Sequence, residues 1–134
     1  MLKSYLIHFI ARYSRLRSKM ISSCAFCKIV TGESKADIVY RDGHATAFRD
    51  IHPVAPTHIL IVPNKHIESV GALEPEDERL VGHLFTVARQ IANEEGVSKS
   101  GYRLITNTGV DGGQTIYHLH LHLIGGKRMR HPMG

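Results

Sequence analysis

The chain has 134 residues, of which 43% are hydrophobic and 22% charged, a composition typical of one soluble globular domain. No apolar run reaches the length of a membrane-spanning helix, which argues against an integral membrane protein. The formal net charge of +5 arises in residues 1–23, which contain five of the 17 basic residues and no acidic residue. Residues 24–134 hold 12 basic and 12 acidic residues and are formally neutral, so we expect this part not to bind nucleic acid.

Residues 1–23 form a basic N-terminal extension to the domain that we expect at residues 24–134. Arginines and serines lie in it between apolar residues at helical spacing, which are Leu2, Tyr5, Leu6, Phe9, Ile10, Tyr13 and Leu16. Three interpretations fit this pattern: a helix that acts weakly at a membrane surface, a transit peptide, and residues upstream of a true start at Met20. We expect a cytoplasmic protein, with organelle targeting as the alternative if the extension is a transit peptide.

The rest of the chain predicts an α+β fold. The expected helices are a short one at residues 26–30, ended by Gly32, and a long one at residues 74–95. The dipeptide Asp42-Gly43 predicts a hairpin between the first two strands. We therefore expect a mostly antiparallel five-stranded sheet packed against one long and one or two short helices. Its strands are predicted at residues 38–40, 45–48, 58–62, 102–106 and 116–124.

Near the C-terminus, His118, His120 and His122 alternate with three leucines. Alternate side chains of a strand lie on opposite faces, so the pattern predicts three imidazoles on one face and three leucines toward the long helix. Imidazoles carry protons, attack as nucleophiles or bind metals near neutral pH. Three interpretations follow: a polar edge strand, a three-histidine metal site, and a nucleophilic imidazole with two helpers.

The loop before these histidines indicates phosphate chemistry. Its glycines permit positive φ values, with which several N–H groups can converge on an anion. Asn107, Gln114 and Thr115 add neutral hydrogen-bond donors. A flexible hairpin loop is the alternative, but the neighbouring histidines favour a bound phosphate and hence a nucleophilic imidazole. Asp50, just after a strand, is a candidate for binding ribose hydroxyls, with an ordinary strand-end acid as the alternative.

Cys24 and Cys27 are the two cysteines of the chain and are separated by two residues. This spacing fits a redox pair, a disulfide or half of a zinc site. A redox pair would follow a strand of a thioredoxin-like unit, which the predicted elements do not contain. For zinc, His58 and His118 are the candidate further ligands, and unligated thiols are the alternative. We interpret the remaining histidines of the domain as surface or capping residues: His44, His52, His66, His83 and His131.

Several ordered motifs between residues 24 and 134 resemble the histidine triad superfamily, in particular its nucleoside phosphoramidate hydrolase branch. The family signature, His-x-His-x-His followed by two apolar residues, is present as His118-Leu-His120-Leu-His122-Leu-Ile. The other matching motifs are Phe48-Arg-Asp50-Ile51, Ala55-Pro-Thr-His58, Ile61-Val-Pro, Asn107-Thr-Gly, Gly113-Gln114 and Gly125-Gly126. The resemblance implies a homodimer whose two sheets join into one continuous sheet, with a purine nucleotide site in each subunit.

The resemblance also implies roles for matching residues. His120 would attack the α-phosphorus and form a covalent nucleotidyl-histidine, with His118 and His122 beside it. The phosphate oxygens would be held by His122, Asn107, Gln114 and Thr115. Asp50 would bind the ribose hydroxyls, and the residues around the purine would be Phe26, Ile29, Phe48 and Ile51. A structural zinc would be bound by Cys24, Cys27, His58 and His118, and no organic cofactor is implied.

We therefore expect a purine nucleoside 5′-phosphoramidate hydrolase that cleaves the P–N bond of AMP-amine or AMP-lysine conjugates. The alternatives are a dinucleoside polyphosphate hydrolase of the same superfamily and a non-catalytic nucleotide-binding module. The chain departs from the branch at its end, where Met129-Arg-His-Pro-Met-Gly134 replaces the usual Met-x-Trp-Pro-Pro-Gly. Because these residues resemble ones that border the partner's active site, the resemblance does not specify the leaving group.

Overall fold

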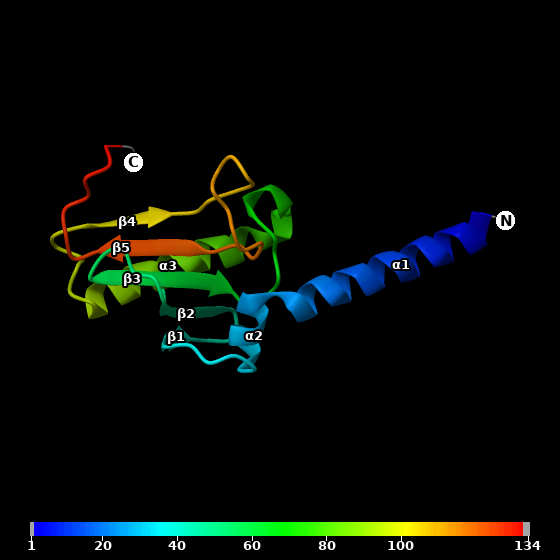
Figure 1. Cartoon of the computed structure of the whole chain (residues 1–134), viewed down its shortest axis with the longest axis horizontal. Helices are drawn as coiled ribbons and strands as arrows, with labels where there is room; N and C mark the ends of the chain where they lie inside the picture. Colours follow the sequence, from blue (N-terminus) through cyan, green and yellow to red (C-terminus); the bar gives the residue numbers. More distant parts are fainter. Residues whose placement is uncertain (1, 133–134) are drawn as a thin grey trace.

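The computed structural model describes residues 2–132, with side chains described for residues 6–17 and 23–132. Figure 1 shows a sheet with a long helix packed on one face and a second long helix that projects away from it. The elements in chain order are α1 (Leu2–Ser23), α2 (Ala25–Thr31), β1 (Ile38–Arg41), β2 (Ala45–Arg49), β3 (Thr57–Pro63), η1 (Val70–Ala72), η2 (Pro75–Asp77), α3 (Glu78–Glu94), β4 (Tyr102–Ile105) and β5 (Leu121–Gly125).

The strands form one five-stranded sheet in the order β1-β2-β3-β5-β4, in which every neighbouring pair is antiparallel. The middle strand, β3, is buried at all seven residues, as its nearly continuous apolar sequence predicts. The predicted β1–β2 hairpin turns at Asp42, whose Oδ1 accepts the N–H groups of His44 and Ala45 at 2.7 Å. The predicted α+β fold with a five-stranded antiparallel sheet is confirmed.

The two faces of the sheet carry separate clusters of buried side chains. Leu119, Leu121 and Leu123 are at most 5% exposed and belong to the cluster on the α3 side. Phe26 from α2 and Phe48 from β2 belong to the cluster on the opposite face, where the ring of Phe26 lies beside His118 and His120. The predicted division of leucines and imidazoles between two faces is therefore confirmed. Burying one leucine contributes roughly 2 kcal/mol, so the leucine face fixes the position of the imidazoles.

The long helix begins later than predicted. Residues Pro75–Asp77, expected within it, form the 3-10 turn η2, and α3 begins at Glu78. A carboxylate oxygen of Asp77 accepts the backbone N–H of Glu74 at 3.0 Å, and the other accepts from Nζ of Lys65 at 2.7 Å. This capping arrangement closes a tight turn ahead of the regular helix.

The last strand is shorter than predicted and begins at Leu121. In the β3–β5 register, Ile61 pairs with Leu121, so two residues further on Pro63 would oppose Leu119. Proline has no N–H to donate, and β3 ends there. His118 and His120 therefore precede the strand, in a segment whose Leu119 N–H donates to the carbonyl of Ile67 at 2.7 Å.

The helix α1 agrees with the helical spacing predicted for the extension. Of its predicted apolar positions, Leu2 and Tyr5 lie outside the side chains that the structure describes, as do Met133 and Gly134 of the C-terminal motif. Among the residues that are described, no helix combines the length and the hydropathy needed to cross a bilayer. The division into residues 1–23 and 24–134 stays a prediction.

Candidate active site

His120 lies at the centre of the histidine run, and the backbone fixes one of its ring nitrogens. Its Nδ1 is 2.7 Å from the carbonyl oxygen of His118. A carbonyl oxygen only accepts hydrogen bonds, so Nδ1 carries the hydrogen and the lone pair of the neutral ring lies on Nε2. The residue is 7% exposed and meets Phe26 edge to face, with 5.1 Å between ring centroids. The structure thus holds His120 in the tautomer that a nucleophilic Nε2 requires.

His122 belongs to a group that also contains His58 and Asp50, and we call these three residues the relay group. The N–H of Val54 donates to Nδ1 of His58 at 3.1 Å, so the hydrogen of the neutral His58 ring is on Nε2. This N–H faces Nδ1 of His122 at 2.9 Å and Oδ2 of Asp50 at 3.3 Å. Because Nδ1 of His122 accepts, the hydrogen of His122 lies on Nε2. A chain that starts at a backbone amide therefore makes Nε2 of His122 a hydrogen-bond donor.

Burial keeps the imidazoles of the relay group neutral at pH 7. It lowers the pKa of His122 to about 4, and the neighbouring His120 and His58 lower it further while Asp50 opposes them. Burial also lowers the pKa of His58, again against the carboxylate of Asp50. The tautomers derived above are those of neutral rings, so they apply at neutral pH.

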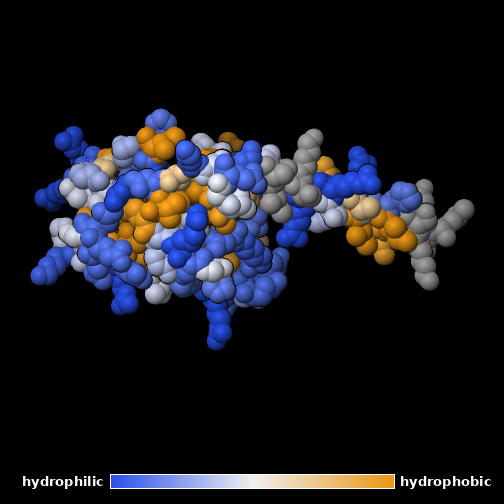
Figure 2. All heavy atoms as spheres, turned by 90° about the horizontal axis from the view of Figure 1, so that it is seen from below, coloured by the Kyte–Doolittle hydropathy of each residue, from blue (hydrophilic) through white to orange (hydrophobic). Residues whose placement is uncertain are grey.

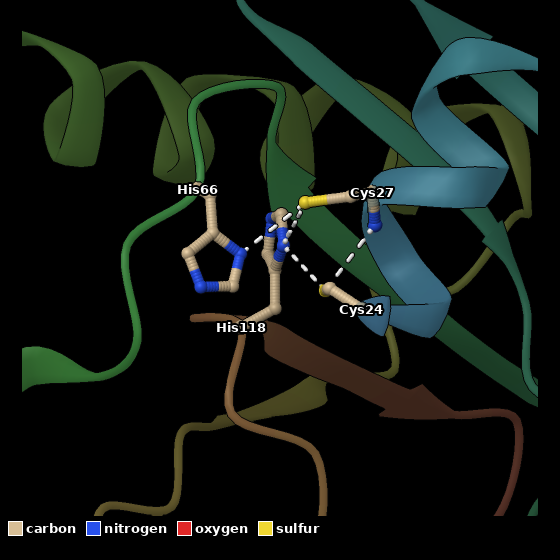
Figure 3. A group of neighbouring side chains, drawn as sticks. All are labelled: Cys24, Cys27, His66 and His118. Atoms are coloured by element: carbon tan, nitrogen blue, oxygen red, sulfur yellow. Dashed lines mark hydrogen bonds between the residues drawn. The ribbon is translucent and has the colours of Figure 1, made fainter. Parts of the chain in front are cut away.

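His118 faces away from the relay group, toward Cys24, Cys27 and His66, and we call these four residues the metal group. Figure 3 shows them pointing at one another: Cys24 directly precedes α2, Cys27 lies in α2, His66 comes from the loop after β3 and His118 from the segment before β5. Sγ of Cys24 is 3.3 Å from Nδ1 of His118. Sγ of Cys27 is 3.2 Å from Nδ1 of His66, and all four ligand atoms lie within 4.8 Å of one another. Two sulfur and two nitrogen donors form the set of a tetrahedral zinc site.

The donor atoms of the metal group fit a cation. Nε2 of His118 is 2.8 Å from the carbonyl oxygen of Pro63, so it carries the hydrogen and Nδ1 directs its lone pair at the cysteines. Burial lowers the pKa of His118 to about 4, which keeps this lone pair available at neutral pH. Burial and the adjacent Cys24 raise the pKa of Cys27 to about 12. Without a cation the thiol of Cys27 therefore stays protonated, whereas a bound metal would stabilise its thiolate.

The structure corrects one predicted metal ligand. His58 does not complete the metal group, because its Nε2 faces His122 and its Nδ1 accepts from Val54. His66, which the sequence analysis assigns to the surface or a cap, takes that place. The signal that could have identified His66 is the strand register, since the end of β3 at Pro63 lies beside the start of the histidine run.

The residues predicted around the purine are of two kinds. Phe26 and Phe48 are 5% and 3% exposed, and their rings meet edge to face at 5.3 Å between centroids. Ile29 packs against them in the same cluster. Ile51 is instead 85% exposed and directly follows Asp50 in the chain. The structure thus brings the two phenylalanines to the histidines as a buried wall and leaves Ile51 at the surface.

Gln114 holds the loop before the histidines closed. Its Oε1 accepts the N–H of Gly109 at 3.0 Å, and its Nε2 donates to the carbonyls of Glu68 and Ile116 at 2.7 and 3.1 Å. Both amide hydrogens are used, so Gln114 does not make the phosphate contact predicted for it. The N–H groups of Gly109, Gly113 and Gln114 are also bonded inside the loop. These three amides therefore brace the loop and do not form the predicted anion cradle.

Asn107 and Thr115, the other predicted phosphate donors, lie in different surroundings. In the β4–β5 register Ile105 pairs with His122, and the half-buried Asn107 follows two residues after Ile105. Thr115 is exposed and lines a hollow of about 330 Å³ with Cys24 and His66. The geometry therefore favours Asn107 over Thr115 as a donor to a group bound at His120.

His120 has a lone pair directed by the backbone, His122 donates a hydrogen bond, and His118 faces the cysteines. Together these three imidazoles define a histidine triad site. Residues 23–133 match the family described as scavenger mRNA decapping enzyme C-term binding. The chain is also 51% identical over 115 residues to the purine nucleoside phosphoramidase of Escherichia coli strain K12, a match that covers 86% of this chain and 93% of that protein.

Solved structures agree. A HIT family hydrolase from Legionella pneumophila superposes with a TM-score of 0.81 at 46% identity, over 84% of this chain and all of the other. A histidine triad protein from Clostridium difficile gives a TM-score of 0.80 at 43% identity, over 82% of this chain and 96% of the other. The chain therefore belongs to the histidine triad family, as the resemblance predicted.

Proposed function

We propose that the chain hydrolyses purine nucleoside 5′-phosphoramidates to a nucleoside monophosphate and an amine. The observation that carries this proposal is the hydrogen bond from Nδ1 of His120 to the carbonyl of His118, which leaves Nε2 as the nucleophilic nitrogen. The relative from Escherichia coli, named a purine nucleoside phosphoramidase, supports the same substrate class.

In the first displacement, Nε2 of His120 attacks the α-phosphorus. A bond forms between Nε2 and phosphorus while the P–N bond to the leaving amine breaks, and the amine takes the electron pair and one proton. The product is a covalent nucleotidyl-histidine that keeps the hydrogen on Nδ1, so its ring is positively charged. The carbonyl of His118, 2.7 Å from Nδ1, stabilises that charge. Nε2–H of His122 is the group that we expect to donate to a phosphate oxygen.

In the second displacement, a water molecule attacks the phosphorus of the intermediate. The Nε2–P bond breaks, its electron pair returns to His120, and the water oxygen remains on the nucleoside monophosphate. The water releases one proton, which balances the proton that the amine took up. Because the ring leaves as a neutral imidazole, hydrolysis is divided into two easier steps.

The nucleoside is expected to lie beside Asp50 and the phenylalanine wall. Oδ1 of Asp50 accepts the N–H of His52 at 2.8 Å and Oδ2 lies 3.3 Å from Nε2 of His58, so each carboxylate oxygen retains a lone pair. These lone pairs are suited to accept hydrogen bonds from two ribose hydroxyls. Asn107, two residues beyond the pair of Ile105 and His122, is the expected neutral donor to the phosphate.

We propose that the metal group binds a structural zinc ion through Cys24, Cys27, His66 and His118. The ligand types and their common orientation support this. Bound zinc would supply a fixed tetrahedral link between α2 and the segment before β5. Since α2 carries Phe26, this link would hold the wall against His120.

We also propose a homodimer in which two chains pair through β4. This strand is at one edge of the sheet, where backbone groups can pair with a second strand. Antiparallel pairing of two copies of β4 would join the sheets into one. Light scattering is expected to give twice the chain mass of 15.0 kDa, whereas a mass equal to one chain would reject the dimer.

The substrate class is tested by comparing cleavage of an AMP-amine conjugate with cleavage of a diadenosine polyphosphate. We expect faster cleavage of the conjugate, and a loss of about a thousandfold or more in His120→Ala. Faster cleavage of the polyphosphate would contradict this substrate class and indicate a dinucleoside polyphosphate hydrolase. AMP binding that survives His120→Ala, with no turnover of either compound by the parent, would indicate a binding module.

A further inference from the structure

The helix α1 presents a hydrophobic surface that the domain does not cover. It runs over 22 residues and projects from the sheet, as Figure 1 shows. Figure 2 shows hydrophobic side chains gathered on this projecting helix with hydrophilic ones beside them. Its large apolar side chains are between 54% and 70% exposed, and they are Leu6, Ile7, Phe9, Ile10, Tyr13 and Leu16.

Most of these apolar side chains share one side of the helix, and Ile7 lies outside it. Leu6, Phe9, Ile10 and Tyr13 follow the spacing of three, four and seven residues that places side chains on a common face. At 3.6 residues per turn, Arg15 lies on the opposite side, between the positions of His8 and Ala11. The described part of α1 is therefore amphipathic, with Arg15 on its polar face and Arg12 at the border, whereas Arg17 lies on the apolar side near the domain.

The charge of α1 is of one sign. Residues 1–23 contain five basic residues and no acidic residue, while residues 24–134 are formally neutral. The net positive charge of the chain is thus concentrated on the helix that carries the exposed apolar face. Such a helix is complementary to a surface that is both negatively charged and apolar beneath.

The domain and α1 share a hollow near the end of the described part of the helix. Tyr13, Leu16 and Arg17 line a hollow of about 550 Å³ with residues that include Lys65 and Glu68. Leu6, Phe9 and Ile10 line none of that hollow, and each stays more than half exposed. A second copy of α1 would cover the apolar face but would bury Arg17, which lies on that side, without an acidic partner from residues 1–23. An anionic lipid surface instead accommodates both faces.

We propose that α1 lies in the plane of an anionic membrane surface and attaches the domain to it. Leu6, Phe9, Ile10 and Tyr13 enter the boundary between headgroups and acyl chains, and Arg12 and Arg15 face lipid phosphates. Over its described residues α1 is not apolar enough to span a bilayer. This attachment is separate from the hydrolase activity, because the apolar face of α1 lies outside the groups of residues around His120.

The test uses the full chain and its co-sedimentation with two kinds of vesicle. One contains phosphatidylglycerol mixed with phosphatidylcholine, and the other phosphatidylcholine alone. We expect binding at least about tenfold stronger to the anionic vesicles, and Phe9→Glu should weaken it by about tenfold or more. Ala11→Glu is the matched control, because it adds the same charge on the far side of the helix and should weaken binding less. Arg12→Gln with Arg15→Gln should remove most of the preference for anionic lipid.

Phosphoramidate hydrolysis in solution should be the same in all these variants, which shows that each is folded. Equal binding of the parent to both vesicles, or none to either, would overturn the proposal. So would equal binding by Phe9→Glu and the parent. If Phe9→Glu instead lowers the mass of the assembly in solution and leaves vesicle binding unchanged, α1 pairs with a second copy and the membrane is rejected.

Discussion

The metal group and the relay group contain similar residues, but their imidazoles differ in which ring nitrogen carries the hydrogen. In the metal group a lone pair faces the centre of the group, and in the relay group a hydrogen does. In the metal group, Nε2 of His118 faces away from the cysteines and donates to the carbonyl of Pro63, so the lone pair on Nδ1 faces the cysteines. In the relay group, Nδ1 of His58 faces away from His122 and accepts from the amide of Val54, so the hydrogen on Nε2 faces His122. The first arrangement suits a cation and the second suits a chain of hydrogen bonds.

This difference shows that residue type alone does not identify a metal site. The ligand atoms of Asp50, His58 and His122 also lie within 4.8 Å of one another, and two histidines with a carboxylate are a common set of metal ligands. A metal on Nε2 of His58 would nevertheless require the bond from Val54 to break. The two groups therefore differ in the backbone group bonded to the ring nitrogen that faces away from them, which is a carbonyl in the metal group and an amide in the relay group. His120 lies between the groups and remains uncoordinated.

The largest expected effect is on the metal group. Cys27→Ser should remove nearly all bound zinc and lower the free energy of unfolding by about 3 kcal/mol, because a thiolate ligand is lost from a buried site. Elemental analysis and denaturant unfolding measure the two effects. Asp50→Asn is the matched control and should retain the metal. Zinc lost from Asp50→Asn and kept by Cys27→Ser would reverse the assignment of the two groups.

The relay group should affect turnover without affecting the metal. His58→Leu removes the N–H that faces Nδ1 of His122 and should lower kcat about a hundredfold, with zinc content unchanged. His58→Gln keeps an amide donor and should recover part of the loss. An unchanged kcat in His58→Leu would show that the tautomer of His122 does not depend on this bond.

The depressed pKa of His122 predicts a loss of stability in acid. Its pKa is about 4 in the folded chain against an ordinary value of 6.5, so below pH 6.5 the unfolded chain binds a proton that the folded chain does not. The contribution is fully present above pH 6.5 and is lost as the pH drops toward 4, by at most about 3 kcal/mol and less because solvent screens this partly exposed ring. Urea unfolding across this range should show a smaller drop in His122→Gln, and the same drop as the parent in His52→Gln, an exposed site. Equal drops in both variants would refute this contribution.

The smallest expected effect separates ribose binding from positioning at Asp50. If its carboxylate binds the hydroxyls, Asp50→Asn should raise KM about tenfold for a ribonucleoside substrate and leave a 2′,3′-dideoxy substrate nearly unaffected. Equal losses for both substrates, in kcat rather than KM, would mean that Asp50 acts through His58, from which it is 3.3 Å away.

The parts of the fold that sequence could predict depend on local patterns. Alternation of leucine and histidine predicts opposite faces, and Asp42-Gly43 predicts the hairpin, because both follow from the geometry of neighbouring residues. The start of β5 at Leu121 could not be found this way. It depends on the partner strand, where Pro63 ends the pairing.

In the candidate site, too, local patterns in the sequence identify some features, while others depend on residues far away in the chain. His120 stands out from its pattern, but its tautomer depends on the carbonyl that its Nδ1 meets. His66 and Gln114 make their contacts with residues 39 and 46 positions away, Cys27 and Glu68, so no local motif reveals them. His58 has the residue type of a zinc ligand, yet the amide of Val54 assigns it to the relay group.

Trapping the covalent intermediate is the most direct test of His120 as the nucleophile. The parent protein would be mixed with an AMP-amine conjugate, quenched in alkaline denaturant to preserve the phosphorus–nitrogen bond, digested and analysed by mass spectrometry. The expected result is AMP attached to Nε2 of His120, absent from His120→Ala, with retention of configuration at phosphorus over the full reaction. AMP on another histidine, or turnover with inversion and no adduct, would contradict this role.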